Sequence, residues 1–344
     1  MEDKEIALRK KAELICSGTL YIPRDIAIPF PLSKSSAGPG AGIESIVVSF
    51  SGMRVKVPVS RIEGKFQLRR AGSSFEILMD GEPFCSDVTI IPTLCHAPGQ
   101  AFVTLRRSCK LGCLFCSINE SRRRGKGEIS VDEAFNLILA ASKKPDFHGV
   151  AITSGISTTV DDQIERIAEL VRLVRESFPE IPIGVEPIVT GIEHVKALRK
   201  AGATELKINI EAATKEIFDK VCPARDYELT HRAVGWAVSE FGRNHVTSNI
   251  IIGLGESDED VLKALEVLAE LGSVGNLRAL RVNEHNRDRL VGALGKNIGI
   301  TPERLLALCK HQEEILRRRG LSARLFKTMC FPCGCCDLVP GIDC

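Results

Sequence analysis

Residues 101–116 read AFVTLRRSCKLGCLFC, an apolar run that leads directly into a loop with three cysteines. Cys109, Cys113 and Cys116 follow one another with the spacing C-x3-C-x2-C. Three thiolates can hold three irons of a [4Fe-4S] cube and leave one iron open to a substrate, whereas clusters that only carry electrons normally have four cysteine ligands. The loop therefore predicts a catalytic iron–sulfur cluster. A zinc site completed by a ligand from elsewhere is the alternative.

The composition limits the class of protein. With 344 residues, of which 44% are hydrophobic, the chain is long enough for one barrel-sized domain and a small appendage. A formal net charge of +2 requires neither nucleic acid nor a membrane surface as partner. The chain has no run of about 18 uncharged apolar residues, and its first residues carry mixed charges rather than a basic signal region. We therefore expect a cytoplasmic protein with no nucleic-acid and no membrane partner.

The thirteen cysteines are unevenly distributed. A reducing cytoplasm disfavours disulfides, so metal ligation is the favoured interpretation of the clustered cysteines. Cys330, Cys333 and Cys336 share an x2 spacing, Cys344 could complete the set, and Cys335 would not easily reach the same cube as its neighbour. We predict a second [4Fe-4S] cluster here, with a zinc knuckle as the alternative. The scattered cysteines are interpreted as small core residues: Cys16, Cys85, Cys95, Cys222 and Cys309.

Three regions are expected along the chain. Residues 1–95 form an N-terminal extension and a small β module, with a helix at 5–17, an extended connector at 22–42 and short strands up to about 91. In residues 96–325, strands alternate with helices that begin at Ser130, Thr190, Ser257 and Thr301. This order favours parallel strands in a partial (β/α)6 barrel, an α/β fold of TIM type. Residues 326–344 are the cysteine-rich tail. The expected barrel strands are 101–105, 150–153, 183–185, 206–210, 248–252 and 277–282.

Polar and glycine residues follow several of these strands, at the end of a barrel where chemistry collects. The second strand ends in Ser154 and Gly155, the third in Glu186 and the fourth in Asn209 and Glu211. Gly253, Gly255 and Glu256 follow the fifth strand, and Arg281 ends the sixth. Glu211 could instead be the solvated start of a helix, and Arg232, on a helix after the fourth strand, could be a surface residue.

The cysteine loop resembles that of the radical S-adenosylmethionine (SAM) superfamily, and residues 100–285 are most similar to its biotin-synthase-related branch. The resemblance implies that the open iron chelates the methionyl group of SAM and that Phe115 shields the cluster. It also implies that Ser154 and Gly155 receive the methionyl amine, although the acidic residue of the family's element is absent here. Asn209 and Glu211 would bind the ribose, and Gly253, Gly255 and Glu256 would lie near the adenine. Glu186, Arg281 or Arg232 would contact substrate or the SAM carboxylate.

The same resemblance implies a reaction. SAM would be cleaved to methionine and a 5′-deoxyadenosyl radical, with a reducing electron donor as partner. A tail cluster outside the barrel is similar to lipoyl synthases, and an archaeal group related to biotin synthase forms half of a two-component lipoyl synthase. This predicts sulfur insertion into an octanoyl chain on an acyl-carrying protein, with a second radical SAM protein as a further partner. The alternatives are a cofactor maturase or peptide-modifying enzyme whose tail cluster transfers electrons, and a non-catalytic zinc-binding module.

Overall fold

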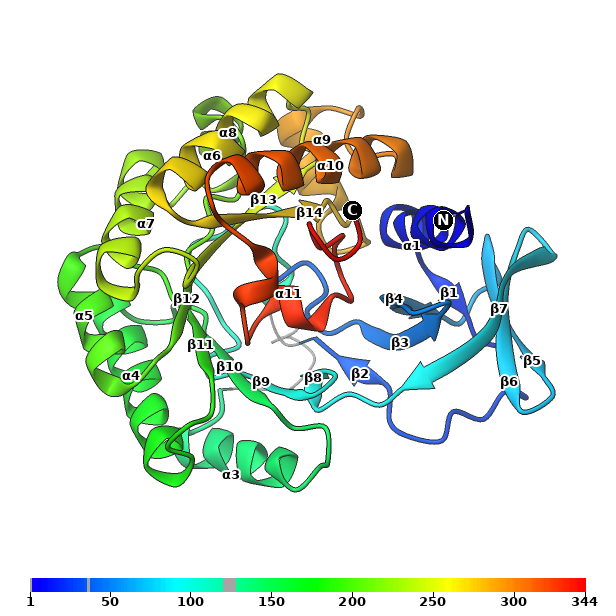
Figure 1. The fold of residues 1–344 in the computed structure, drawn as a ribbon, viewed down its shortest axis with the longest axis horizontal. Coiled ribbons are helices and arrows are strands. Elements are labelled where there is room, and N and C mark those ends of the chain that lie inside the picture. The colour runs from blue at the N-terminus through cyan, green and yellow to red at the C-terminus, as the bar shows by residue number, and fades with distance from the viewer. Residues whose placement is uncertain (1, 36–37, 120–127) are drawn as a thin grey trace.

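The computed structural model describes residues 2–35, 38–119 and 128–344. Figure 1 shows a crescent of strands wrapped in helices on one side and a smaller β module on the other, with the C-terminal segment between them. The module begins with α1 (Glu2–Ser17), which packs against β4 and α10. Its strands are β1 (Leu20–Tyr21), β2 (Ser33–Lys34), β3 (Glu44–Phe50), β4 (Met53–Ser60), β5 (Phe66–Ala71), β6 (Ser74–Met79) and β7 (Glu82–Ile91).

The sheet of this N-terminal module closes on itself. Its strand order is β2-β3-β4-β1-β5-β6-β7, and β7 also pairs with β3, so that β2 alone extends beyond the ring. Leu20, Phe66, Leu68 and Ile77 are fully buried inside it. Closure leaves few unpaired strand edges and gives the module a core of its own. It confirms the β module that the sequence predicted for this region.

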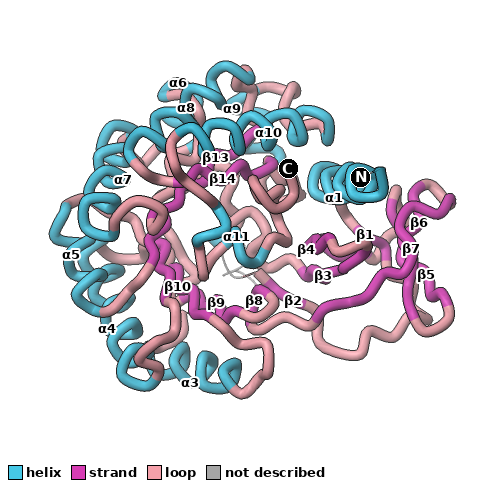
Figure 2. The backbone as a smooth tube through the Cα atoms, in the orientation of Figure 1, coloured by secondary structure: helices cyan, strands magenta, loops and turns pink. Residues whose placement is uncertain are grey.

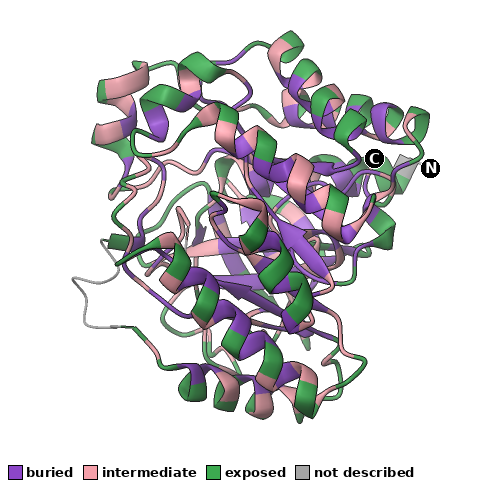
Figure 3. Cartoon of the chain, turned by 90° about the vertical axis from the view of Figure 1, so that its left-hand side faces the viewer, coloured by how far each residue is buried: buried purple, intermediate pink, exposed green. Residues whose placement is uncertain are grey.

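The second sheet is a parallel half-barrel, as the alternation of strands and helices predicted. Its order is β14-β13-β12-β11-β10-β9-β8, with all pairs parallel except β8 with β9. The strands are β8 (Cys95–Ala97), β9 (Gln100–Thr104), β10 (Gly149–Thr153), β11 (Ile183–Glu186), β12 (Glu205–Lys207), β13 (Val246–Ile252) and β14 (Val274–Ala279). Figure 3 shows helices with exposed outer faces in front of buried strands, so the concave face remains for a site.

The helices are α3 (Val131–Ser142), α4 (Val160–Ser177), α5 (Ile192–Ala201), α6 (Lys215–Val221), α7 (Tyr227–Phe241), α8 (Asp258–Leu271), α9 (Arg287–Leu294) and α10 (Pro302–Arg318). Capping boxes at Ser130 and Ser257 begin α3 and α8, as expected. The expected cap at Thr190 is wrong, since Gly191 is the N-cap of α5 and makes no side-chain bond. The fourth strand is shorter than expected: β12 ends at Lys207, before the chain bends through a positive φ of 64° at Glu211.

The C-terminal tail enters the half-barrel from the amino ends of its strands. It contains the 3-10 turn η1 (Ala323–Leu325) and α11 (Cys330–Cys333). Gln100, the first residue of β9, donates to the Met329 carbonyl at 3.1 Å and accepts from the Met329 amide at 2.8 Å. Glu205, the first residue of β12, accepts three hydrogen bonds from Lys327 and Thr328. Figure 2 shows α11 inside the crescent, so the expectation of a tail outside the barrel is wrong.

Candidate active site

The cysteine loop lies at the carboxyl end of β9, beside a cavity of about 270 Å³. Cys109, Cys113 and Cys116 all line this central cavity and are partly exposed. Asn119 closes the loop, because its side chain accepts from the Cys109 amide at 3.0 Å and donates to the Cys109 carbonyl at 2.7 Å. Gly112 has a φ of 66°, a left-handed conformation that suits glycine and turns the loop sharply.

The donor chemistry of this loop fits an iron–sulfur cluster. A hydrogen bond with the buried Cys222 thiol lowers the pKa of Cys113 and so favours the thiolate, the form that binds iron. Within the described residues, no three cysteine, histidine or carboxylate side chains already surround one point as metal ligands. The sequence predicts Cys222 as a core residue only. Because α6 ends at its C-cap Cys222, beside the loop, this thiol contacts Cys113, one of the predicted cluster ligands.

Phe115 lies between Cys113 and Cys116 in the sequence. Its side chain lines the central cavity, and the residue is 6% exposed. Its ring belongs to an apolar cluster that includes Leu254 and Leu280. The fully buried Asn286 donates from Nδ2 to the Phe115 carbonyl at 3.0 Å, which fixes the backbone of the loop at this point. The structure thus places Phe115 where a shielding side chain is expected.

Ser154 and Gly155 also line the central cavity, after β10. A Cβ atom at Gly155 would lie 2.2 Å from the Ser108 carbonyl oxygen, so this position permits only glycine without a shift of the cysteine loop. The Ser154 hydroxyl accepts from the Arg106 amide at 3.3 Å and donates to the Gly155 carbonyl at 3.0 Å. These contacts tie the second strand end to the loop that carries the three cysteines.

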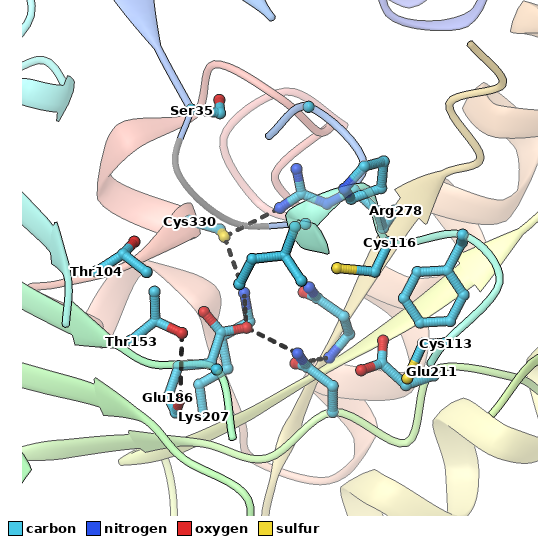
Figure 4. A pocket seen from close by; sticks show the side chains of 18 of the residues that line it. Ser35, Thr104, Cys113, Cys116, Thr153, Glu186, Lys207, Glu211, Arg278 and Cys330 are labelled. Carbon is cyan, nitrogen blue, oxygen red and sulfur yellow. Dashed lines mark hydrogen bonds and ion pairs between the residues drawn. The ribbon is translucent and has the colours of Figure 1, made fainter. Parts of the chain in front are cut away.

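Glu186, Lys207 and Asn209 line the central cavity and form a network, of which Figure 4 labels Glu186 and Lys207. Asn209 donates from Nδ2 to Glu186 Oε1 at 2.7 Å, and Lys207 Nζ lies 3.3 Å from the same oxygen. Asn209 Oδ1 accepts from the Asn249 amide at 3.0 Å. The structure therefore brings Glu186 and Asn209 together, as their strand ends predicted.

Glu211 is buried beside Arg225, a residue that the sequence did not indicate. Arg225 Nη1 lies 2.8 Å from Glu211 Oε1, and Nη2 donates to the Asn209 carbonyl at 2.8 Å. Burial raises the pKa of Glu211 and the charge of Arg225 opposes that shift. Arg232, expected near SAM, is exposed on α7 and does not line the cavity. The cation at this place is Arg225, from the loop that precedes α7.

Gly253 and Gly255 follow β13 but are not among the described residues that line the central cavity. Both have positive φ values, 99° and 107°. Glu256 accepts from the amides of Gly253 at 2.7 Å and Leu254 at 2.8 Å, and pairs with Arg304 at 3.1 Å. The carboxylate of Glu256 therefore stabilises the turn formed by residues 253–256. Leu254 is the residue of this turn that packs with Phe115.

The tail cysteines face the same central cavity as the cysteine loop. Cys330, Cys333 and Cys336 line it, whereas Cys335 is fully buried and donates from Sγ to the Cys333 carbonyl at 3.1 Å. Cys344 does not join them, because it forms a disulfide with Cys309 of α10. Of the four tail cysteines that the sequence predicted as ligands of the second cluster, three therefore line the cavity and Cys344 does not. The disulfide also differs from the expectation that the scattered cysteines are unpaired.

Three cations that the sequence analysis missed surround the tail cysteines. Arg278 Nη2 lies 3.1 Å and Lys207 Nζ 3.4 Å from Cys330 Sγ (Figure 4). Lys56, from β4 of the N-terminal module, is 3% exposed and lines the same cavity. Lys207 and Arg278 lie within apolar barrel strands, and this position is a sequence signal for a site, because a buried charge requires a partner. Lys56 had no such signal, since only the tertiary fold brings the module to the barrel.

Arg281 and His96 complete this wall of the cavity. Arg281 donates from Nη2 to the Lys56 carbonyl at 3.1 Å. Burial and the charges of Lys56, Arg278, Arg281 and Lys207 hold the pKa of His96 well below its usual value, so the ring is neutral. Its Nδ1 lies 3.0 Å from Lys56 Nζ and 3.2 Å from Ser35 Oγ. Arg281 therefore lies at the cavity as predicted, within a wall of positive charge.

A parallel half-barrel whose strand β9 leads to three cysteines beside a central cavity is the arrangement expected of an α/β barrel protein that holds an iron–sulfur cluster. Residues 103–268 match the family model of the radical SAM superfamily. This match supports the radical SAM superfamily, and the half-barrel and the cysteine loop are similar to those expected of it. Its members bind SAM at a [4Fe-4S] cluster, which identifies the expected cofactors of the loop.

The curated relatives are distant. A biotin synthase of Campylobacter jejuni subsp. jejuni is 24% identical over 225 residues, which cover 62% of this chain and 79% of the relative. The mitochondrial lipoyl synthase of Drosophila melanogaster is 28% identical over 48% of this chain, and the lipoyl synthase of Halorubrum lacusprofundi 25% identical over 51%. The chain spans only about half the length of these lipoyl synthases, 44% and 56%.

Solved structures agree with the fold. A crystal structure of methylornithine synthase superposes with a TM-score of 0.52 at 20% identity and covers 63% of this chain and 62% of its own. The maturase HydG of the [FeFe]-hydrogenase superposes with a TM-score of 0.51 at 16% identity over 68% of this chain and 53% of its own. At these identities the superpositions establish the partial barrel alone. Among the described residues, no helix has the length and apolarity needed to cross a membrane.

Proposed function

We propose that this protein cleaves SAM reductively at a [4Fe-4S] cluster on Cys109, Cys113 and Cys116 and inserts sulfur into a protein-bound octanoyl chain. The observation that carries the proposal is that two separate cysteine sets face one cavity. A cluster held by Cys109, Cys113 and Cys116 would supply the electron that cleaves a sulfur–carbon bond of SAM, with the external reductant as the electron source. A substrate carbon in the cavity is then within reach of both the radical and a second centre on Cys330, Cys333 and Cys336.

Residues of the barrel orient SAM in this proposal. Glu211, held by Arg225, accepts from the ribose hydroxyls together with Asn209, because a carboxylate can accept from two hydroxyls at once. The backbone at Ser154 and Gly155 receives the methionyl amine, and Phe115 excludes water from the cluster. The turn at Gly253 and Gly255 supports the adenine end of the site from behind the cavity wall, because Leu254 in this turn packs in one apolar cluster with Phe115.

A second cavity, of about 700 Å³, supports an acyl substrate. It lies between the N-terminal module and the β14 end of the barrel, and shares Pro39, Gly40 and Arg281 with the central cavity. Its walls are largely aliphatic, with a cationic rim at Arg287 and Lys296. The volume lies in the range of small-molecule sites, and an aliphatic chain suits such walls. The aliphatic wall residues include Ile15, Ile43, Val59, Leu280, Val282, Val291, Ile298 and Ile300.

Three further partners belong to this proposal: a reducing electron donor, an acyl-carrying protein and a second radical SAM protein. The test combines purified protein, SAM, a chemical reductant and an octanoyl-lysine peptide, with the tail centre reconstituted from labelled sulfide. Formation of 5′-deoxyadenosine together with labelled thiolated peptide supports sulfur insertion. Deoxyadenosine without labelled product would support instead a maturase or peptide-modifying reaction in which the tail centre transfers electrons. Zinc in place of tail iron would refute a redox role for the tail.

A further inference from the structure

The tail cysteines lie in a surrounding that carries more positive than negative charge. Lys56, Lys207, Arg278 and Arg281 line the central cavity at this end. Two carboxylates oppose them: Glu186 lies 3.3 Å from Lys207, and Asp337 lies 3.0 Å from Arg278. Among the described residues, the other two cations, Lys56 and Arg281, have no carboxylate partner. An excess of positive charge in a buried site requires an anion to balance it.

Lys56 is the clearest case. Its Nζ donates to the His96 carbonyl at 2.8 Å and lies 3.0 Å from His96 Nδ1, both neutral groups. No ion pair of the described chain reaches it, although its side chain is buried. Cys330, Cys333 and Cys336, whose thiolates are proposed to hold the tail centre, line the same cavity as Lys56. The counter-charge of Lys56 is therefore the tail centre itself.

A metal centre with three thiolates accounts for only part of the excess charge. An oxidised [4Fe-4S] core is formally dipositive, so three thiolates make the complex a monoanion, and the surrounding would retain one positive charge. A fourth cysteine would remove it, but none is placed to do so. Cys344 is paired with Cys309, and Cys335 directs its thiol to the Cys333 carbonyl. The remaining charge and the missing ligand both call for one small external anion.

We propose that Cys330, Cys333 and Cys336 hold a cluster whose fourth iron faces the central cavity, and that a small sulfur anion, hydrosulfide, binds this iron beside Lys56. The inference rests on the tail cluster of the proposed function. Soft sulfur anions suit iron in such clusters, and Lys56 supplies a charge-assisted contact. Binding is ligand association: one iron–sulfur bond forms, and no electron is transferred. The N-terminal module thereby contributes a cation to the site.

The geometry also explains why the module is joined to the tail. The Lys56 amide donates to the Cys335 carbonyl at 2.7 Å, and Arg281 donates to the Lys56 carbonyl. The backbone of Lys56 is thus fixed to the tail on one side and to the barrel on the other. Its side chain enters the cavity from a position that neither the tail nor the barrel could supply. Lys56 is a positioning residue for the anion.

The experiment uses full-length protein in which Cys109, Cys113 and Cys116 are all changed to Ala, so that the tail centre alone is loaded with ⁵⁷Fe. Mössbauer spectra should show one iron site distinct from the others. Hydrosulfide should shift the spectra of the reduced centre in a saturable manner, whereas acetate should not. Lys56→Met should weaken hydrosulfide binding about tenfold, the loss expected for one charge-assisted contact. Lys65→Ala is the matched control, since Lys65 pairs with Glu13 at 2.6 Å on the outside of the same module.

The outcomes separate the two proposals. A protein without tail iron would refute the tail cluster and this inference together. A four-iron centre that ignores hydrosulfide would refute only this inference, as would hyperfine coupling to ¹⁵N-labelled histidine that identifies His96 as the fourth ligand. Circular dichroism of the Lys56→Met protein confirms that it is folded, and the titration of the unsubstituted Lys56 protein tests the open iron independently of that variant.

Discussion

Arg225 and Glu211 form a buried ion pair, 2.8 Å from Nη1 to Oε1, with exposed side-chain fractions of 6% and 11%. Glu211 also has a φ of 64°, so the chain turns at this residue and depends on the pair to hold it. Arg225→Ala should destabilise the protein by about 3–5 kcal/mol, because it leaves a buried carboxylate without its partner. Thermal unfolding measures this.

The same variant tests SAM binding. Arg225→Ala should raise the Kd for SAM about tenfold, since Glu211 loses the group that orients it. Arg232→Ala is the control, because Arg232 is exposed on α7. Equal effects of the two variants on SAM affinity in isothermal titration would contradict the assignment of Arg225.

The three loop cysteines should act as one unit. Changing Cys109, Cys113 and Cys116 to Ala removes all proposed ligands of the SAM-binding cluster. The protein should lose about four irons, as expected for one [4Fe-4S] cluster, and all formation of 5′-deoxyadenosine. Iron on the tail should remain. Chromatographic assay of deoxyadenosine and colorimetric iron analysis check both points, and persistent SAM cleavage would be incompatible with the assignment.

Cys344 should be dispensable for iron binding. Cys344→Ala removes the disulfide to Cys309, 35 residues away, and leaves the cavity-lining cysteines intact. Iron content should stay unchanged, while the free energy of unfolding falls by about 3 kcal/mol under oxidising conditions. Cys330→Ala provides the contrast and should lose the tail iron. Loss of tail iron in the Cys344→Ala protein would restore Cys344 as a ligand.

Gly155 should be required for the shape of the cysteine loop. A Cβ at this residue would lie 2.2 Å from the Ser108 oxygen and 2.9 Å from its carbonyl carbon, so Gly155→Ala should displace the loop. We expect at least a tenfold fall in SAM cleavage and reduced iron loading. Gly64→Ala is the control, because no atom lies within 4 Å of the added carbon. Normal cleavage by Gly155→Ala protein would show that the loop adapts to the added methyl group.

The second cavity can be blocked at Val282, which lines it and is not among the residues that line the central cavity. Val282→Trp fills space between the N-terminal module and the barrel end, and should weaken binding of an octanoyl-lysine peptide about tenfold while SAM affinity is kept. Val267→Trp, on the exposed face of α8, is the matched control. Fluorescence anisotropy of a labelled peptide measures the effect. Unchanged peptide binding by the Val282→Trp protein would remove this cavity from the proposal.

Much of the half-barrel could be predicted from the sequence because its signals are local. The apolar strands, the capping boxes at Ser130 and Ser257 and the glycine that ends α5 each occupy a few consecutive residues. The C-x3-C-x2-C loop is equally local, so its three cysteines were assigned without the fold. The fourth strand and the cap at Thr190 were wrong in detail, because the exact ends of elements depend on packing.

The placement of the tail was decided only by the tertiary structure. Gln100 and Met329 are 229 residues apart and Glu205 and Thr328 are 123 apart, yet their hydrogen bonds bring the tail into the barrel. Neither residue type nor spacing encodes such a pairing, because many buried polar groups could satisfy one another. The same holds for Cys309 with Cys344, and for Lys56, which a separate module delivers to the cavity. The sequence alone determined the chemistry of the loop and the order of the barrel, while the fold decided which distant side chains share its cavity.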